Sequence, residues 1–293
     1  MKGILKKILK KIFNRKYKKH SPHIVANVVK LSNNELLLNR AALVTGGTSG
    51  IGYAIADAML SAGVAAVVIT GRTQERCVSA VEKLLAEDET RVGRVFYEVM
   101  DIRDINNFDS SMKNILNKLN DKKLSILVNN AGVQGARFGC AVEEEFDNVM
   151  DTNYKGVFFL SQWVAKYMIE NNVKGNILNV ASASSYRPTN GAYALSKACI
   201  KELTAGMAKF LIPYGIVVNG VAPGPTATPM TGKKENSSIY HPSNPSGRFA
   251  TAEEIANMAV VLCSDMSRMV VGSIVNMTGG AGDITVDDCK YEF

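Results

Sequence analysis

The fold of this chain is decided by residues 41–52, which read Ala41-Ala-Leu-Val-Thr-Gly-Gly-Thr-Ser-Gly-Ile-Gly52. The apolar start predicts a buried strand, the glycines after it predict a tight turn, and the residues from Gly50 onwards predict a helix. Glycine lets the backbone approach a phosphate without a Cβ in the way, and a helix N-terminus aims unpaired N–H groups at an anion. This turn therefore indicates a dinucleotide pyrophosphate site. We expect the site to include Gly46, Thr48, Ser49, Gly50, Ile51 and Gly52.

Outward from this turn, short apolar runs alternate with longer amphipathic stretches from about residue 40 to residue 280. Strands are predicted at 41–45, 65–70, 94–99, 124–128, 175–181, 215–221 and 272–277. Helices are predicted at 50–62, 74–87, 105–119, 147–171, 191–212 and 252–264, the last opening with a capping box at Thr251 and Glu254. Strands separated by helices predict an α/β protein with a single doubly wound (Rossmann) domain, in which helices cover both faces of a parallel sheet of about seven strands.

The composition excludes several classes of protein. The chain has 293 residues, of which 46% are hydrophobic and 21% charged, so it is neither disordered nor collagen-like. Apolar runs such as 64–69 have six residues, whereas a membrane-spanning helix needs about 20. The five cysteines are scattered, which is neither a disulfide framework nor a metal-binding spacing. This cysteine usage suits the reducing cytoplasm.

The charge is concentrated at the N-terminus. Nine of the first 19 residues are Lys or Arg, and removing these nine charges from the net +7 leaves about −2 for the remainder. Apolar residues at helical spacing between Ile4 and Phe13 predict a basic amphipathic arm over 1–20 that suits an anionic membrane surface. A solvated tail or an arm packed on its own domain remains an alternative. No element for specific nucleic-acid recognition accompanies the arm. A linker at 21–38, the domain at 39–280 and a tail at 281–293 complete the organisation.

The second predicted strand ends in Gly71 and Arg72, about 20 residues after the glycine turn. A domain that binds NAD usually carries an acid here, which accepts a hydrogen bond from the ribose 2′-hydroxyl. An arginine would instead pair with the 2′-phosphate of NADP. An ordinary solvated arginine is the alternative, but the position favours NADP(H) over NAD(H).

A tyrosine and a lysine, Tyr193 and Lys197, lie four residues apart in a predicted helix and therefore share one face. Free tyrosine has a pKa near 10 and is a poor acid or base at neutral pH. A nearby ammonium stabilises the phenolate and lowers this pKa. The pair is thus a candidate for proton transfer, although such a pair alone is common on protein surfaces.

Together with other motifs, this pair makes the chain resemble the short-chain dehydrogenase/reductase family over about residues 39–280. The matching motifs are Thr45-Gly-Gly-Thr-Ser-Gly-Ile-Gly52, Asp101-Ile102, Asn129-Asn-Ala-Gly132, Asn153, Ser182, Tyr193 with Lys197, Pro223-Gly224 with Thr228, and Thr278-Gly-Gly280. The resemblance implies an oxidoreductase that transfers hydride between a nicotinamide cofactor and a carbonyl or secondary alcohol. It also implies a homodimer or homotetramer formed through the helices at 147–171 and 191–212.

The resemblance assigns a role to each matching residue. Tyr193 would be the general acid or base, Lys197 would hold the nicotinamide ribose, Ser182 would orient the substrate oxygen, and Asn153 would hold a relay water. The implied cofactor contacts are Asp101 and Ile102 at the adenine, Asn129, Ala131 and Gly132 at a ribose, and Pro223, Gly224 and Thr228 at the carboxamide. Asn129 and the residues after it would also support the central strand. Ser182 precedes Tyr193 by 11 residues, where many members have 13. For Ser184 and Ser185 we expect plain loop hydrogen bonding.

The expected substrate loops are polar and carry Gln134, Arg137, Tyr186, Arg187, Lys233, Lys234 and His241. Such loops favour a small polar substrate, either sugar-like or phosphorylated, over an apolar one. Two alternatives remain open. One is reduction of a 3-oxoacyl thioester, with a cation such as Arg137 or Lys233 meeting a carrier's phosphate. The other is a non-catalytic, membrane-recruited sensor of dinucleotides.

Overall fold

The structure is a computed structural model that describes residues 35–232 and 238–282. These residues belong to one of the two compact units into which the chain divides, Ser32–Phe293. The arm predicted at 1–20 and most of the predicted linker and tail lie outside the described residues, as do Lys233 and Lys234. The described cysteines, Cys77, Cys140, Cys199 and Cys263, are free. No described helix combines the length and apolar character needed to cross a bilayer.

Seven strands form one parallel sheet, as the sequence predicts. They are β1 (Ala41–Val44), β2 (Ala66–Gly71), β3 (Val95–Val99), β4 (Leu124–Asn129), β5 (Asn176–Val180), β6 (Val217–Pro223) and β7 (Ile274–Met277). Their order in the sheet is β3-β2-β1-β4-β5-β6-β7, and every neighbouring pair is parallel. The chain order reverses between β1 and β4, and in doubly wound sheets ligands bind beyond the carboxyl ends of the strands at such a point.

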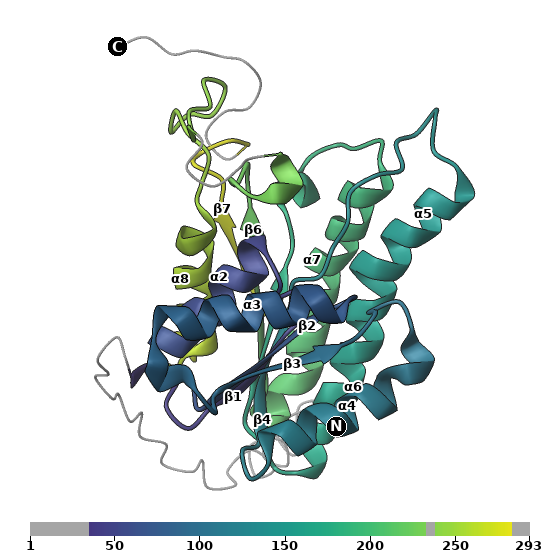
Figure 1. Ribbon diagram of the computed structural model, residues 1–293. Coiled ribbons are helices and arrows are strands. Elements are labelled where there is room, and N and C mark those ends of the chain that lie inside the picture. The colour runs from purple at the N-terminus through teal and green to yellow at the C-terminus, as the bar shows by residue number, and fades with distance from the viewer. Residues whose placement is uncertain (1–34, 233–237, 283–293) are drawn as a thin grey trace, which may run out of the picture. The chain divides into compact units, whose positions relative to one another are not determined.

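Helices cover both faces of the sheet (Figure 1). They are α2 (Gly50–Ser61), α3 (Gln74–Glu87), α4 (Phe108–Leu119), α5 (Glu143–Met150), α6 (Gly156–Glu170), α7 (Ala192–Leu211) and α8 (Ala252–Cys263). All four residues of β1 are buried, and their side chains alternate between two hydrophobic cores, one on each face of the sheet. Val44 packs in one core with α2, α3 and α8, whereas Leu43 packs in the other with α4, α6 and α7. Both side chains are fully buried.

The chain is helical over the helix predicted at 147–171, but it contains a π-helical turn that the sequence did not predict. The structure has α5, then a π-helical turn at Asp151–Lys155, then α6. The start of α6 lies against the loop after β3, where a Cβ on Gly156 would be 2.2 Å from the carbonyl oxygen of Ile102. Glycine thus permits a close contact that fixes α6 after the turn, and π-helical turns of this kind are frequent at functional sites.

Candidate active site

A cleft of about 900 Å³ opens at the carboxyl ends of the strands, and each of the segments that follow β1 to β7 contributes to its wall. Most of the expected site residues line it: Gly46, Thr48, Ser49, Gly50, Ile51, Arg72, Asp101, Ile102, Ala131, Gly132, Ser182, Tyr193, Lys197, Pro223, Gly224 and Thr228. Three expected residues, Gly52, Asn129 and Asn153, are buried next to the cleft and do not line it. Among the described residues, no group of His, Cys, Asp and Glu is arranged to hold a metal ion.

The glycine turn forms a cradle that side chains would fill. A Cβ on Gly46 would lie 2.9 Å from the Cα of Ala131, and one on Gly52 would lie 2.4 Å from the carbonyl oxygen of Gly46. Gly46 and Gly50 also have positive φ angles of 63° and 56°, which favour glycine. Ser49 caps α2 without a side-chain hydrogen bond to its first turn. The N–H groups of that turn are therefore available to an anion, and a pyrophosphate fits here.

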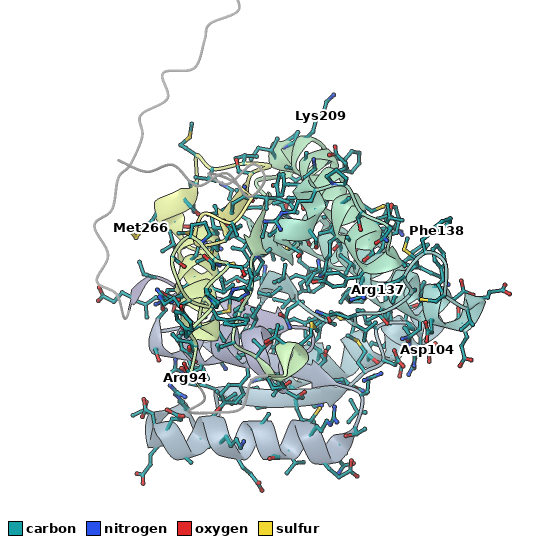
Figure 2. The ribbon with its side chains drawn as sticks, turned by 90° about the horizontal axis from the view of Figure 1, so that it is seen from above. Arg94, Asp104, Arg137, Phe138, Lys209 and Met266 are labelled. Atoms are coloured by element: carbon teal, nitrogen blue, oxygen red, sulfur yellow. The ribbon has the colours of Figure 1, made fainter. Side chains whose placement is uncertain are left out.

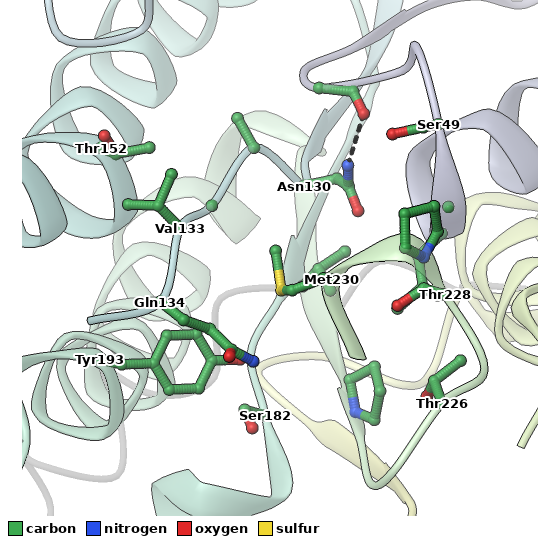
Figure 3. A pocket seen from close by; sticks show the side chains of 18 of the residues that line it. Ser49, Asn130, Val133, Gln134, Thr152, Ser182, Tyr193, Thr226, Thr228 and Met230 are labelled. Atoms are coloured by element: carbon green, nitrogen blue, oxygen red, sulfur yellow. Dashed lines mark hydrogen bonds between the residues drawn. The ribbon is translucent and has the colours of Figure 1, made fainter. Parts of the chain in front are cut away.

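The residue that joins this turn to the loop after β4 is Asn130. It belongs to the motif Asn129-Asn-Ala-Gly132, but it was not among the cofactor contacts expected from the sequence. The Nδ2 atom of Asn130 donates to the carbonyl oxygens of Thr45 and Gly46, each at 3.0 Å, and Figure 3 shows one hydrogen bond of this amide as a dashed line. Asn129 instead lies buried at the end of the central strand β4, where its Nδ2 donates to Oδ1 of Asn179 at 2.8 Å. Asn129 therefore supports the central strands, and the expected contact with a ribose passes to the residues after it.

At the end of β2 the structure leaves little room for the acid of an NAD-binding domain. A Cβ on Gly71 would lie 2.6 Å from Cγ2 of Thr48 and 2.9 Å from Sγ of Cys77. Two exposed arginines line the cleft here instead, Arg72 and Arg76, and neither forms a hydrogen bond or salt bridge with a described residue. Arg76 was not anticipated, although the helix that carries it was predicted with its observed bounds, 74–87.

The carboxylate of Asp101 lies at the same end of the cleft. The guanidinium of Arg103 grips it, with Nη2 donating at 2.6 Å and Nε at 3.0 Å. These hydrogen bonds hold the pKa of Asp101 below its usual range, and attraction to Arg72 adds a smaller effect. Asp101 is therefore an ionised acceptor at neutral pH.

Tyr193 and Ser182 meet at the other end of the cleft (Figure 3). Burial raises the pKa of Tyr193 above its usual value, and a hydrogen bond with Ser182 opposes this rise. The lowering that we expected from a nearby ammonium is not seen. The hydroxyl of Ser182 is also 2.7 Å from that of Ser184 and accepts a hydrogen bond from the Ser184 N–H. Ser184 thus makes the hydrogen bonds within the loop that we expected, and it also lines the cleft.

Lys197 is buried one helical turn beyond the tyrosine in α7. Its Nζ donates to the carbonyl oxygen of Val180, at the end of β5, over 2.7 Å. Burial lowers its pKa to about 8. An ammonium has three N–H donors, and one is used in this contact. The remaining N–H groups of Lys197 can serve a ligand in the cleft, whose wall this residue helps to form.

Asn153 lies in the π-helical turn and is fully buried. Its Oδ1 accepts from the N–H of Val133 at 2.8 Å, and its Nδ2 donates to the carbonyl oxygen of the same residue at 2.9 Å. A third hydrogen bond runs from Nδ2 to the hydroxyl of Ser196, three residues after Tyr193, over 3.1 Å. The Asn153 amide thus ties α7 to the loop after β4, and these contacts occupy its Nδ2 donors.

Beyond Tyr193, the cleft is lined by Gln134, Ser184, Arg187 and Met230. Figure 3 shows the Gln134 amide beside the Tyr193 ring, close to Ser182. Other residues expected in the substrate loops do not line the cleft. The Tyr186 ring lies 5.2 Å from Nζ of Lys201, and His241 packs on Phe249 with ring centroids 4.5 Å apart. Arg137 precedes Phe138, which projects at the outer rim of the molecule and is 86% exposed (Figure 2).

Comparisons with known proteins agree with this geometry. Residues 40–238 match the family described as short chain dehydrogenase. The 3-oxoacyl-[acyl-carrier-protein] reductase FabG of Aquifex aeolicus is 31% identical over 249 residues, which cover 83% of this chain and 98% of the relative. The gluconate 5-dehydrogenase of Gluconobacter oxydans is 34% identical over 247 residues, which cover 82% of this chain and 93% of the relative.

Solved structures show the same fold. A gluconate 5-dehydrogenase from Burkholderia cenocepacia, in complex with NADP and tartrate, is 29% identical and superposes with a TM-score of 0.76 over 87% of this chain and 99% of its own. A 3-ketoacyl-(acyl-carrier-protein) reductase from Brucella melitensis, in complex with NADH, is 27% identical with a TM-score of 0.73 over 84% and 99% of the two chains. The chain therefore belongs to the short-chain dehydrogenase/reductase family and is an oxidoreductase of CH–OH and keto groups.

Proposed function

We propose that this chain is an NADP(H)-dependent oxidoreductase that interconverts a carbonyl and a secondary alcohol on a small polar substrate. One observation carries the proposal: Tyr193 and Ser182 line the same cleft as the buried Lys197 and the glycine turn. The domain that performs the reaction spans 39–280, with the arm at 1–20 and the tail at 281–293 as appendages.

The side chains divide the proton chemistry between them. Because burial raises the pKa of Tyr193, its phenol is protonated at neutral pH and donates to the carbonyl oxygen during reduction; in oxidation it takes the proton back. Ser182 hydrogen-bonds the same oxygen and orients it. Lys197 binds the ribose hydroxyls with the N–H groups that Val180 leaves unused. Asn153 positions the helix that carries this pair, through its hydrogen bond to Ser196.

The dinucleotide supplies or accepts the hydride, and the chain's contribution is to bind and orient it. The glycine turn and the N-terminus of α2 hold the pyrophosphate, Asp101 accepts from the adenine, and Thr228 binds the carboxamide. Similar structures contain NADP in one case and NADH in another. Arg72 and Arg76, together with the crowding at Gly71, favour a 2′-phosphate in this chain.

A polar substrate is supported by the polar groups that surround Tyr193, namely Ser184, Gln134 and Arg187. Relatives named gluconate 5-dehydrogenase and 5-keto-D-gluconate 5-reductase, 34% and 32% identical to this chain, act on sugar acids. Relatives named as 3-oxoacyl-carrier reductases are equally similar, so reduction of an acyl thioester is the second candidate. A non-catalytic sensor would have no use for the hydrogen-bonded Tyr193 and Ser182.

The test is NADPH oxidation by the purified protein across a panel of carbonyls. The panel sets keto-sugars, keto-aldonates and phosphorylated ketones beside acetoacetyl thioesters and apolar ketones, with NADH in parallel. We expect turnover of polar carbonyls with NADPH. A preference for thioesters would replace the first candidate with the second. In Tyr193→Phe, turnover falls by about 10²- to 10⁴-fold while NADPH still binds; a sensor would be indifferent to this change.

We also propose that the protein forms a homodimer or homotetramer through α6 and α7. Phe158, Leu195 and Phe210 on these helices are 38%, 48% and 69% exposed, and association would remove these apolar groups from water. Light scattering after size-exclusion chromatography tests this, with Leu195→Glu as the variant expected to weaken association. A monomeric wild-type protein at micromolar concentration would contradict the proposal.

For the arm at 1–20 we propose peripheral attachment of a cytoplasmic protein to anionic membranes. Its support is the sequence, which places lysines around an apolar stripe. Sedimentation with phosphatidylserine vesicles, compared with phosphatidylcholine vesicles, tests this in the full chain and in a form lacking residues 1–20. Equal sedimentation of the two forms with anionic vesicles would exclude the arm as the anchor.

A further inference from the structure

The charged groups that line the cleft are almost all cationic. The cations are Arg72, Arg76, Arg103, Arg187 and Lys197, and the single acid that lines the cleft within the described residues is Asp101. Arg103 neutralises Asp101 through a salt bridge of 2.6 Å. Low-dielectric walls lined by one sign of charge concentrate the field and attract ions of the opposite sign. The dinucleotide phosphates account for the cations at the end of β2, but they do not account for Arg187.

Arg187 lies at the opposite end of the cleft, in the segment that also supplies Ser182. A short 3₁₀ helix, Ala183–Tyr186, separates the two residues, and the N–H of Arg187 bonds to the carbonyl oxygen of Ser184 at 3.4 Å. Regular structure therefore fixes the position of the arginine backbone relative to the hydroxyl that orients the reacting oxygen. A group placed in this way favours substrates that carry a second substituent at a fixed distance from that oxygen.

The guanidinium of Arg187 lies against the segment after β7. Its Nη2 lies 2.5 Å from the place where a Cβ on Gly282 would be, so the absence of a side chain at this glycine makes room for it. Within residues 35–232 and 238–282, the side chain of Arg187 forms no hydrogen bond or salt bridge, and it is exposed. Its N–H donors are therefore open to a ligand in the cleft.

We propose that Arg187 is a specificity-determining residue that binds an anionic group of the substrate, either a carboxylate or a phosphate, while Tyr193 and Ser182 hold the reacting oxygen. This inference rests on the proposed function and narrows its substrate from polar to anionic. Carboxylate and phosphate both match the planar fork of a guanidinium. Arg137, on the neighbouring loop, does not line the cleft and takes no part.

The test compares acids with their neutral analogues. Turnover with NADPH is measured for keto acids of increasing chain length and for their primary amides, and for a phosphorylated ketone and its dephosphorylated form. Wild-type protein prefers the anion of each matched pair, with an optimum at one chain length. In Arg187→Met, kcat/KM for the preferred anion falls by about 10- to 100-fold, and its advantage over the neutral analogue is lost. Arg137→Met keeps the advantage.

The outcomes separate this inference from the proposed function. Equal turnover of acid and amide by wild-type protein, or an advantage that survives in Arg187→Met, overturns the role of Arg187 and leaves the oxidoreductase intact. A larger effect with the phosphorylated pair identifies the anion as phosphate, and a larger effect with the keto acids identifies it as carboxylate. If no carbonyl is reduced, the proposed function fails.

Titration calorimetry tests whether Arg187 binds an anionic group, and it does not depend on turnover. A polyhydroxy acid and its amide are titrated into the protein in the presence of saturating NADP⁺. Tighter binding of the acid that disappears in Arg187→Met supports the proposal. Equal binding of the two compounds by wild-type protein overturns it.

Discussion

Ser182 lies close to Tyr193 (Figure 3), and its hydroxyl is 2.7 Å from Oγ of Ser184. We predict that Ser184 is a positioning residue. Its replacement by Ala removes one neutral hydrogen bond, worth about 0.5–1.5 kcal/mol, so kcat should fall by roughly 2- to 10-fold with little change in KM. Ser184→Thr keeps a hydroxyl and should restore kcat. Equal kcat for wild type and the Ala variant would show that Ser184 has no positioning role.

The buried ammonium of Lys197 predicts a pH-dependent contribution to stability. Burial lowers its pKa from 10.5 to about 8, so between these values the unfolded chain binds a proton that the folded chain has lost. Stability relative to Lys197→Met therefore rises with pH over this window, by about 3 kcal/mol in all. Below pH 8 both states are protonated and the difference is constant, at its least favourable for the wild type.

Urea unfolding of both proteins at pH 7, 8, 9 and 10 measures this difference, and groups common to the two proteins cancel. The two curves of unfolding free energy against pH should diverge above pH 8. Parallel curves would mean that Lys197 keeps its ordinary pKa in the folded chain.

At the scale of the element, the sequence predicted the strands and helices to within a few residues, because local patterns encode them. The capping box at Thr251 and Glu254 is present in the structure, as predicted. The π-helical turn at Asp151–Lys155 was not predicted, since the apolar pattern runs through it and the hydrogen bonds of Asn153 in the turn go to a residue distant in sequence, Val133. Asn129 supports the central strands as expected, but Asn130 lines the cleft in its place, for a related reason. Adjacent residues at a strand end face different ways, and the exact end of β4 decides which faces the ligand.

The contact that ends the π-helical turn makes a prediction with a matched control. A Cβ on Gly156 would lie 2.2 Å from the Ile102 carbonyl oxygen, so Gly156→Ala must displace backbone and should lower stability by about 1–3 kcal/mol. Gly206 in α7 has no atom within 4 Å of its Cβ position, and Gly206→Ala should raise stability by about 0.5–1 kcal/mol. Thermal unfolding compares the two variants. A neutral effect of Gly156→Ala would show that α6 can shift away from Ile102 without cost.

At the scale of the whole molecule, the cleft joins segments that follow all seven strands, so a dinucleotide that binds there stabilises the folded domain as a unit. Binding at 100 times the dissociation constant adds about 2.7 kcal/mol, which raises Tm by roughly 5–10 °C for a domain of this size. The 2′-phosphate contributes through Arg72 and Arg76, and we therefore predict a larger rise with NADPH than with NADH at equal concentration. The double variant Arg72→Ala/Arg76→Ala should lower the NADPH shift to the NADH value and leave the NADH shift almost unchanged, because neither arginine is needed for the parts that the two cofactors share. Equal shifts for NADPH and NADH in the wild-type protein would contradict the choice of NADP(H), and a difference that survives in the double variant would place the 2′-phosphate elsewhere in the cleft.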